Sequence, residues 1–351
     1  MDNKRLIERS IDPASSILSA LKKMDNLGVK SLIVIGGNNK FLGILSIGDI
    51  QRSIIQNISL EGPIISILRK NPKFARPNQQ VDEIKDQMLR FRMEFMPVVS
   101  VNGEVTNIYF WEELFIEDQQ IPYTQFSNPV VIMAGGLGTR LRPLTNVYPK
   151  PLMPYGQRTI IEEIMGRFAR HGCSDFYVSV NFKSDLIKYY LEQQDLGYNL
   201  NYIRENKPLG TGGSLSLLKG RINTSFFVTN CDIIIDQDYN EILRYHIENK
   251  NEITIISALK HYPIPYGVLE TGENGDLLHF QEKPEITFKI NSGMYILESK
   301  VLNEIPENTF FPITEVINTI RNKGWKVGVF PVSEKSWKDI GSWDEYKRQL
   351  G

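Results

Sequence analysis

The sequence has few cysteines and no long apolar run. Its 351 residues include two cysteines, Cys173 and Cys231, which lie far apart and outside any CxxC pattern. Such cysteines suit a reducing compartment, form no zinc site and are expected to be small buried side chains. No segment approaches the ~18 apolar residues of a membrane span, and no apolar signal region follows the N-terminus. We therefore expect a cytoplasmic protein without a membrane partner.

An excess of charge of one sign is also missing. Forty basic residues stand against forty-one acidic ones, which leaves a net charge of −1. Without a Lys/Arg-rich block there is no electrostatic reason to expect a nucleic-acid partner. With 41% apolar and 23% charged residues the composition is that of a globular protein, and the length predicts two or three domains.

The first third of the chain contains an internal repeat. At an offset of 64 residues, Pro13 aligns with Pro77, and a helical apolar period precedes an apolar strand in each copy, Leu32 to Ile35 or Met96 to Val99. A polar turn, a second strand and a short helix follow. Each copy therefore predicts an αββα unit, and two such units must pack together to bury their apolar faces.

This arrangement resembles a tandem pair of cystathionine-β-synthase (CBS) domains. In the first copy, the run Gly43-Ile-Leu-Ser46-Ile-Gly-Asp49 matches the ligand-binding segment of that family. The resemblance implies that Ser46 meets a phosphate and Asp49 a ribose hydroxyl, usually of an adenine nucleotide. The second copy has Phe110 and Glu113 at these positions, so we do not expect an equivalent second site. A pair that only packs and dimerises is the alternative.

A polar segment without helical period follows the repeats and contains a proline. We expect it to link two domains. The predicted ranges are 1–120 for the tandem CBS domain (repeats about 1–60 and 65–118), 121–128 for the linker and 129–351 for the second domain.

A glycine-rich turn follows a short apolar strand at the start of the second domain. The run Ala134-Gly135-Gly136-Leu137-Gly138-Thr139-Arg140 lacks the Lys-Ser/Thr of a Walker loop and the third glycine of a dinucleotide fingerprint. Its small residues let backbone N–H groups approach a phosphate, and the Arg140 guanidinium suits phosphate oxygens. Lys150, between two prolines, adds a second cation. The segment is therefore a candidate phosphate-binding loop.

The string GGLGTRLRPLTNVYPKPLMP resembles the signature of sugar-1-phosphate nucleotidyltransferases, and the resemblance extends over residues 129–351. Alternating strands and helices predict an α/β domain with a Rossmann-like, mostly parallel sheet and ligands at the carboxyl ends of the strands. The family's base-binding loop is matched by Glu205, Pro208, Gly210 and Thr211. Its sugar-binding half is matched by Gly267, Glu270, Glu282, Lys283 and Asn291.

The resemblance implies transfer of a nucleotide to a sugar 1-phosphate with release of pyrophosphate. Positioning and charge neutralisation supply the catalysis, because no protein nucleophile is needed. We expect Arg140 to neutralise the leaving pyrophosphate, Lys150 the α-phosphoryl region and Lys283 the sugar phosphate. Asp232 and Asp339, each predicted at a strand end, are expected to hold one Mg²⁺, which prefers hard oxygen ligands.

The nucleotide base is predicted from Glu205, which stands where related thymidylyl- and uridylyltransferases commonly carry glutamine. Since a carboxylate only accepts hydrogen bonds, it suits the two adjacent donors of guanine and favours GTP. A solvent-facing carboxylate unrelated to the base is the alternative.

The substrate and assembly are implied by architecture alone. A CBS pair fused to such a domain resembles the glucosamine-1-phosphate guanylyltransferases of legionaminic acid biosynthesis. Mannose 1-phosphate as the sugar, or a glucose-1-phosphate thymidylyl- or uridylyltransferase, are alternatives, and a non-catalytic nucleotide sensor is a further one. Both kinds of domain tend to self-associate, which implies a homo-oligomer.

Overall fold

The computed structural model describes residues 3–115, 123–341 and 343–350, and it divides the chain into two compact units, Met1–Tyr123 and Thr124–Gly351. Residues 121 and 122 of the expected linker lie outside the described residues. Further along, the Phe126 ring lies 5.6 Å from that of Phe227, and the Phe126 N–H donates to the His171 carbonyl at 2.7 Å. The last part of the expected linker is thus packed on the C-terminal unit, because the Phe126 ring stacks against Phe227.

The N-terminal unit contains the αββα arrangement twice. A short helix and strand, α1 (Asn3–Arg9) and β1 (Ser10–Ile11), precede the first copy, and β1 pairs with β2 in parallel. The first copy comprises α2 (Ile17–Leu27), β2 (Ser31–Gly36), β3 (Lys40–Ser46) and α3 (Ile47–Ile55). The second comprises α4 (Val81–Phe91), β4 (Phe95–Val99), β5 (Val105–Phe110) and α5 (Trp111–Leu114).

Apolar residues of both copies form a shared core in the N-terminal unit. Ile33 of the first copy belongs to one buried cluster with Phe95 of the second. Such sharing is expected because one copy is too small to cover its own apolar face. On α4 the buried face is narrower than the periodicity suggests, since Ile84 and Met88 are buried while Val81 is 40% exposed.

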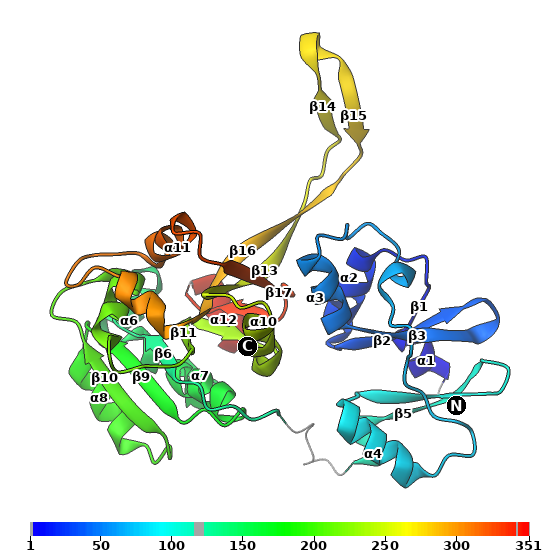
Figure 1. Cartoon of the computed structure of the whole chain (residues 1–351), viewed down its shortest axis with the longest axis horizontal. Coiled ribbons are helices and arrows are strands. Elements are labelled where there is room, and N and C mark those ends of the chain that lie inside the picture. The colour runs from blue at the N-terminus through cyan, green and yellow to red at the C-terminus, as the bar shows by residue number, and fades with distance from the viewer. Residues whose placement is uncertain (1–2, 116–122, 342, 351) are drawn as a thin grey trace. The chain divides into compact units, whose positions relative to one another are not determined.

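The C-terminal unit is built on a seven-stranded sheet (Figure 1). Its strand order is β10 (Asn199–Arg204), β9 (Asp175–Val180), β6 (Val130–Met133), β11 (Phe226–Asn230), β16 (Glu285–Leu297), β13 (Ile253–Pro263), β17 (Val327–Val332). The four strands from β10 to β11 are parallel, β16 is antiparallel to both of its neighbours, and β13 and β17 are parallel. The prediction of an α/β domain with a mostly parallel sheet is confirmed.

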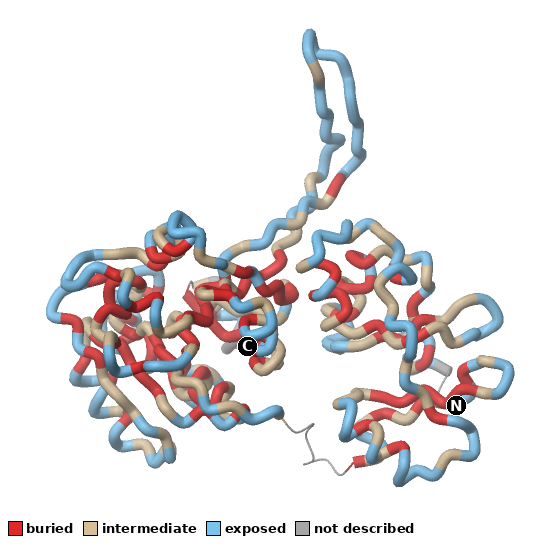
Figure 2. The backbone as a smooth tube through the Cα atoms, in the orientation of Figure 1, coloured by how far each residue is buried: buried red, intermediate tan, exposed pale blue. Residues whose placement is uncertain are grey.

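Helices cover the sheet through apolar faces, and Figure 2 shows the buried residues concentrated along the sheet strands. In α7 the buried Ile164 and Phe168 follow a helix start at which Thr159 and Glu162 form a capping box. No helix in the described parts of the chain is long and apolar enough to cross a membrane. The helices are α7 (Ile160–Ala169), α8 (Ser184–Gln193), α9 (Gly210–Leu215), α10 (Tyr239–Glu248), α11 (Ile313–Asn322) and α12 (Trp343–Leu350), with a four-residue α6 (Leu144–Val147).

A hairpin arm continues β13 and β16 beyond the sheet (Figure 1). Residues 264–284 form this arm, and its strands β14 (Val268–Thr271) and β15 (Leu277–Gln281) pair with each other. Every residue of the two strands is exposed, as Figure 2 shows. The arm thus carries apolar side chains in water, among them Leu278 and Phe280.

Candidate active site

The candidate phosphate loop begins where β6 ends. The Ala134 N–H donates to the Ser179 carbonyl at 2.8 Å, which extends the pairing of β6 with β9 to the start of the loop. Gly138 has a φ of 62°, and a Cβ added there would lie 2.8 Å from Thr145 Cγ2, so that only glycine fits. The loop is thereby held on one path, and it leads into the short turn that carries Arg140.

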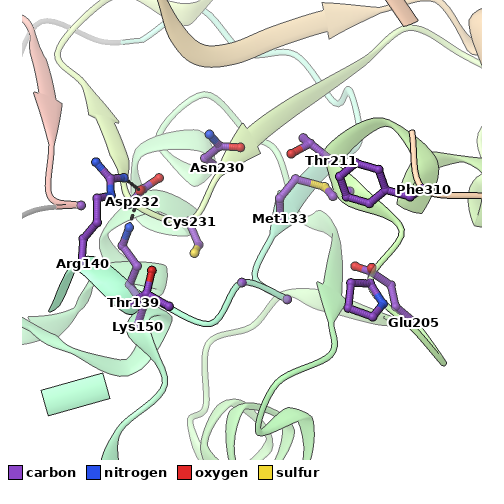
Figure 3. Close-up of a pocket in the computed structure, with 16 residues that line it drawn as sticks. Met133, Thr139, Arg140, Lys150, Glu205, Thr211, Asn230, Cys231, Asp232 and Phe310 are labelled. Carbon is purple, nitrogen blue, oxygen red and sulfur yellow. Dashed lines mark hydrogen bonds and ion pairs between the residues drawn. The ribbon is translucent and has the colours of Figure 1, made fainter. Parts of the chain in front are cut away.

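Four charged side chains meet beside this loop, and Figure 3 shows three of them, Arg140, Lys150 and Asp232. Lys150 forms a hydrogen-bonded ion pair with Asp232, and both are buried, at 8% exposure each. Arg140 Nη2 lies 3.5 Å from Asp232 Oδ2, and Arg140 Nη1 lies 3.7 Å from Asp339 Oδ2. Two of the three predicted cations are thus brought together with the predicted metal ligands.

Strand pairing places the two carboxylates side by side. β12 (Ile233–Ile235) and β18 (Trp337–Asp339) are antiparallel with Ile233 opposite Asp339, and the Ile340 N–H donates to the Asp232 carbonyl at 2.8 Å. Two carboxylates are a partial ligand set of the hard oxygen type that Mg²⁺ takes, and this ion usually keeps waters and substrate phosphates as further ligands. Across the described residues, no group of three or more His, Cys, Asp or Glu side chains forms a complete metal site.

Glu205 lies at the other end of the site. Its carboxylate is 9% exposed and accepts hydrogen bonds from the Ser179 hydroxyl at 2.7 Å and the Leu209 N–H at 3.0 Å. The alternative of a solvent-facing Glu205 is therefore wrong, because strand β9 and the base loop enclose the side chain. Each carboxylate oxygen retains capacity for a further donor.

A cavity of about 350 Å³ joins the two ends. Ala134 is buried and does not line the cavity. Asp339 does not line it either, but Asp339 pairs with Arg140, which does. Of the predicted residues, those that line it are Gly135, Gly136, Gly138, Thr139, Arg140, Lys150, Glu205, Pro208, Gly210, Thr211 and Asp232.

The cavity walls also include residues that the sequence analysis did not assign to a site. Asn230 and Cys231 could have been found from the sequence, because they directly precede Asp232 at the end of β11. Phe310 carries no comparable signal, since it comes from a segment that no motif marks. Met133 and Gly341 complete this set.

The predicted sugar-binding residues are not among those that line the cavity. Gly267, Glu270, Glu282 and Lys283 are exposed on the hairpin arm. Asn291 lies on β16, where its side-chain amide donates to the Tyr295 hydroxyl at 2.8 Å. The structure thus brings together the residues predicted to bind phosphate and base and leaves the predicted sugar residues apart, and all of these roles stay predictions.

In the N-terminal unit, Ser46 and Asp49 bond to each other. Ser46 is the N-cap of α3, and Asp49 accepts hydrogen bonds from the Ser46 N–H at 2.9 Å and from Arg69 Nε at 2.8 Å. Burial alone would raise the pKa of the Asp49 carboxyl, but the bonds from Ser46 and Arg69 outweigh it and hold this pKa below its usual value. Glu113 caps the corresponding helix of the second copy by accepting from the Phe110 N–H at 3.0 Å.

A further cavity of about 500 Å³ lies in the N-terminal unit. It is lined by residues of α1, β1 and α2, such as Leu6, Ile11 and Lys23. Ser46 and Asp49 are not among the residues that line it.

A mostly parallel sheet with a glycine-rich turn at a strand end, followed by converging cations, is typical of an α/β domain that binds a nucleotide or another phosphate ester. Comparison with known families narrows this class. The profile of the nucleotidyl transferase family matches residues 129–349, and that of the CBS domain matches residues 4–56. The chain belongs to the nucleotidyl transferase family.

Individual relatives agree with this assignment. The mannose-1-phosphate guanylyltransferase catalytic subunit beta of Dictyostelium discoideum is 37% identical over 182 residues, which are 50% of this chain and 51% of that protein. The crystal structure of HddC from Yersinia pseudotuberculosis is 26% identical with a TM-score of 0.51, covering 63% of this chain and 97% of that one. The same protein complexed with GMP-PN is 25% identical with a TM-score of 0.50, covering 63% and 97%. The chain spans about half the length of the curated relatives it matches.

Proposed function

We propose that the C-terminal unit joins the nucleotidyl group of a nucleoside triphosphate to a sugar 1-phosphate and releases pyrophosphate. The observation that carries this proposal is the meeting of Arg140, Lys150, Asp232 and Asp339 beside the glycine-rich loop, in a chain of the nucleotidyl transferase family. The reaction brings several anionic groups to one point, and it needs fixed cations there.

Each of the four side chains has a role in this reaction. Arg140 is half exposed at the mouth of the charged end, where its guanidinium can follow the leaving pyrophosphate. Lys150 is buried and fixed by Asp232, so its ammonium stays at the α-phosphoryl position without reorganisation. Asp232 and Asp339 would hold Mg²⁺, which when bound supplies charge neutralisation at the phosphates.

We infer that the nucleotide is GTP. Glu205 lies at the end of the cavity opposite the cations, and its carboxylate can accept from the two neighbouring donors of guanine. The mannose-1-phosphate guanylyltransferases among the relatives and the GMP-PN complex of HddC support the same base.

We infer that the sugar is glucosamine 1-phosphate and that the product GDP-glucosamine serves legionaminic acid synthesis. This inference rests on the combination of a CBS domain match with a nucleotidyl transferase match in one chain. Mannose 1-phosphate is the competing substrate, and the names of the curated relatives favour it.

A panel of four nucleotides and of several hexose 1-phosphates tests these inferences. Pyrophosphate release is measured for every pair, with and without Mg²⁺. We expect the highest kcat/KM for GTP with glucosamine 1-phosphate and a loss of turnover on chelation. Turnover with mannose 1-phosphate but not with glucosamine 1-phosphate would identify mannose 1-phosphate as the substrate. No turnover with any pair would favour a nucleotide sensor.

For the N-terminal unit we propose that an adenine nucleotide binds at Ser46 and Asp49. Arg52 and Arg69, which pair with Asp49, supply cations for its phosphate. AMP is titrated onto the full chain by calorimetry, with Ser46→Ala as the site variant and Glu113→Gln as the matched variant in the second copy. We expect heat of binding with the parent and with Glu113→Gln, and none with Ser46→Ala. No heat with any of these three proteins would mean that the N-terminal unit only packs and does not bind AMP.

A further inference from the structure

Phe310 lines the cavity, and it lies in a segment, residues 309–312, that packs against the loop of residues 205–213. The Phe311 N–H donates to the Leu209 carbonyl at 2.8 Å, and the Gly213 N–H donates to the Phe311 carbonyl at 2.7 Å. These two bonds join a segment before α11 to the loop that leads into α9. The position of residues 309–312 is thus set by the base loop itself.

Two glycines allow this contact to be made between backbones. A Cβ added at Gly212 would lie 2.7 Å from the Phe311 carbonyl oxygen, and one added at Gly213 would lie 2.5 Å from the Thr309 carbonyl oxygen. Any side chain at either position would push the two segments apart. The glycines of the base loop therefore serve to bring residues 309–312 against it.

The side chain of Phe310 projects from this segment into the cavity. Figure 3 shows its ring at the same end as Thr211 and Glu205, away from Arg140 and Asp232. The ring is 64% exposed, whereas Phe311 packs against the main core cluster. Among the described residues, the Phe310 ring stacks on no other aromatic ring. An exposed aromatic face at the cavity thus has no aromatic stacking partner in the described part of the chain.

We propose that Phe310 is the surface on which the nucleotide base stacks, and that it favours purines over pyrimidines. This inference rests on the function proposed above and adds a specificity-determining residue to it. Stacking accepts any base, but the larger face of a purine gains more from it. Glu205 then bonds to the edge of the base while Phe310 covers its face.

Steady-state kinetics of the full chain with GTP and UTP test the proposal through three substitutions. Phe310→Ala removes the ring, Phe310→Leu keeps an apolar side chain without an aromatic face, and Phe310→Trp enlarges the face. We expect Ala and Leu to raise KM for GTP about tenfold or more, and Trp to keep it within about threefold. The preference for GTP over UTP should also fall in the Ala and Leu variants, but by a smaller factor, because UTP loses part of its stacking too.

The value of kcat should stay within about threefold in all three variants, because stacking acts equally on the ground state and the transition state. Phe91→Ala, at an exposed phenylalanine in the N-terminal unit, is the matched control and should match the parent. An unchanged KM in Phe310→Ala, or a parent-like KM in Phe310→Leu, would overturn the stacking role. Measurements on the parent protein separate the two hypotheses. If the parent shows no turnover at all, the proposed reaction is refuted. If the parent turns over and KM for GTP does not respond to the Phe310 substitutions, only this inference is refuted.

Discussion

The cavity and the hairpin arm both belong to the C-terminal unit but differ in how they fix their side chains. In the cavity, Lys150 and Asp232 are buried and paired. Lys150 lies in a short 3-10 turn, and Asp232 lies between β11 and β12, the second of which pairs with β18. On the arm, Glu270 and Lys283 are exposed, Glu270 on β14, whose partner is β15, and Lys283 just after β15. An isolated two-stranded hairpin is marginally stable in water.

This contrast shows which side chains of the predicted site are held in place by the fold. Side chains at the ends of buried strands cannot move without disturbing the core, so their convergence is a property of the fold. Side chains on the arm have no such constraint. The predictions below test whether the cavity and the arm serve one reaction.

The largest effect is expected from Asp232→Asn. The substitution keeps the size of the side chain but removes the charge that pairs with Lys150 and Arg140 and that would hold the metal. We expect kcat to fall about 1,000-fold. Asp195→Asn, at an exposed aspartate, is the control for the measurement of pyrophosphate release. Near-normal rates of Asp232→Asn in saturating Mg²⁺ would place the metal elsewhere.

Lys150→Met should reduce activity and stability together. It leaves the buried Asp232 without its closest cation, and a broken buried pair costs about 3 kcal/mol of unfolding free energy. We expect kcat to fall about 100-fold. Lys188→Met breaks an exposed pair with Glu192 and should cost less than about 1 kcal/mol. Denaturant unfolding of both variants compares a buried with an exposed pair, and equal losses would contradict the structural account of the cavity.

Glu205→Gln should change the choice of base. The amide can still accept from the Leu209 N–H, and its NH₂ group would face the Ser179 hydroxyl, which can turn to accept. The fold is therefore kept, while a donor is presented to the donors of guanine. We expect kcat/KM for GTP to fall about tenfold and that for UTP to rise. Glu192→Gln is the control, and an unaltered GTP/UTP ratio would remove Glu205 from base recognition.

Lys283→Ala tests whether the arm takes part. If Lys283 binds the sugar phosphate as predicted, KM for the sugar 1-phosphate should rise about tenfold while KM for GTP stays constant. Lys289→Ala, at another exposed lysine on β16, is the control. An unchanged sugar KM would separate the arm from the reaction. If Lys283→Ala does raise this KM, the Lys283→Ala and Asp232→Asn chains can be mixed. Restored activity in the mixture would show that the arm of one chain serves the cavity of another.

The smallest effect on activity is expected from a cysteine on the arm, His279→Cys. Burial raises the pKa of Cys173 and of Cys231 to about 12, so both native thiols stay protonated and unreactive at pH 8. The arm position is exposed, so its thiol should be alkylated at once, with activity unchanged. Mass spectrometry counts the labels. Rapid labelling of the parent would show that Cys173 or the cavity-lining Cys231 is more accessible than the structure indicates.

The raised thiol pKa values also set a dependence of stability on alkaline pH. The unfolded chain loses its thiol protons from about pH 9, whereas the folded chain keeps them to about pH 12. Unfolding free energy should therefore fall by about 1 kcal/mol per thiol and pH unit in this window. Chemical unfolding between pH 8 and pH 11 measures it, and replacing both cysteines by alanine should reduce the slope.

Much of the fold could be predicted because its signals are local. The offset of 64 residues reveals the repeated unit, and the apolar run before the glycine-rich turn reveals β6. Strand-end positions then placed Asp232 near the phosphate loop, since parallel strands end at one edge. The exposure of Val81 on α4 could not be predicted, because periodicity gives the direction of an apolar helix face but not its width.

By itself the sequence determined the αββα repeats, the mostly parallel sheet, the glycine-rich turn and the charged residues around it, because each depends on neighbours in the chain. Only the tertiary structure decided that Arg140 reaches Asp339, that Glu205 is enclosed, and that Phe310 faces the cavity. It also decided that the predicted sugar residues lie on an exposed arm. These contacts join segments far apart in the chain, and such proximity arises from strand pairing and packing, which local pattern does not encode.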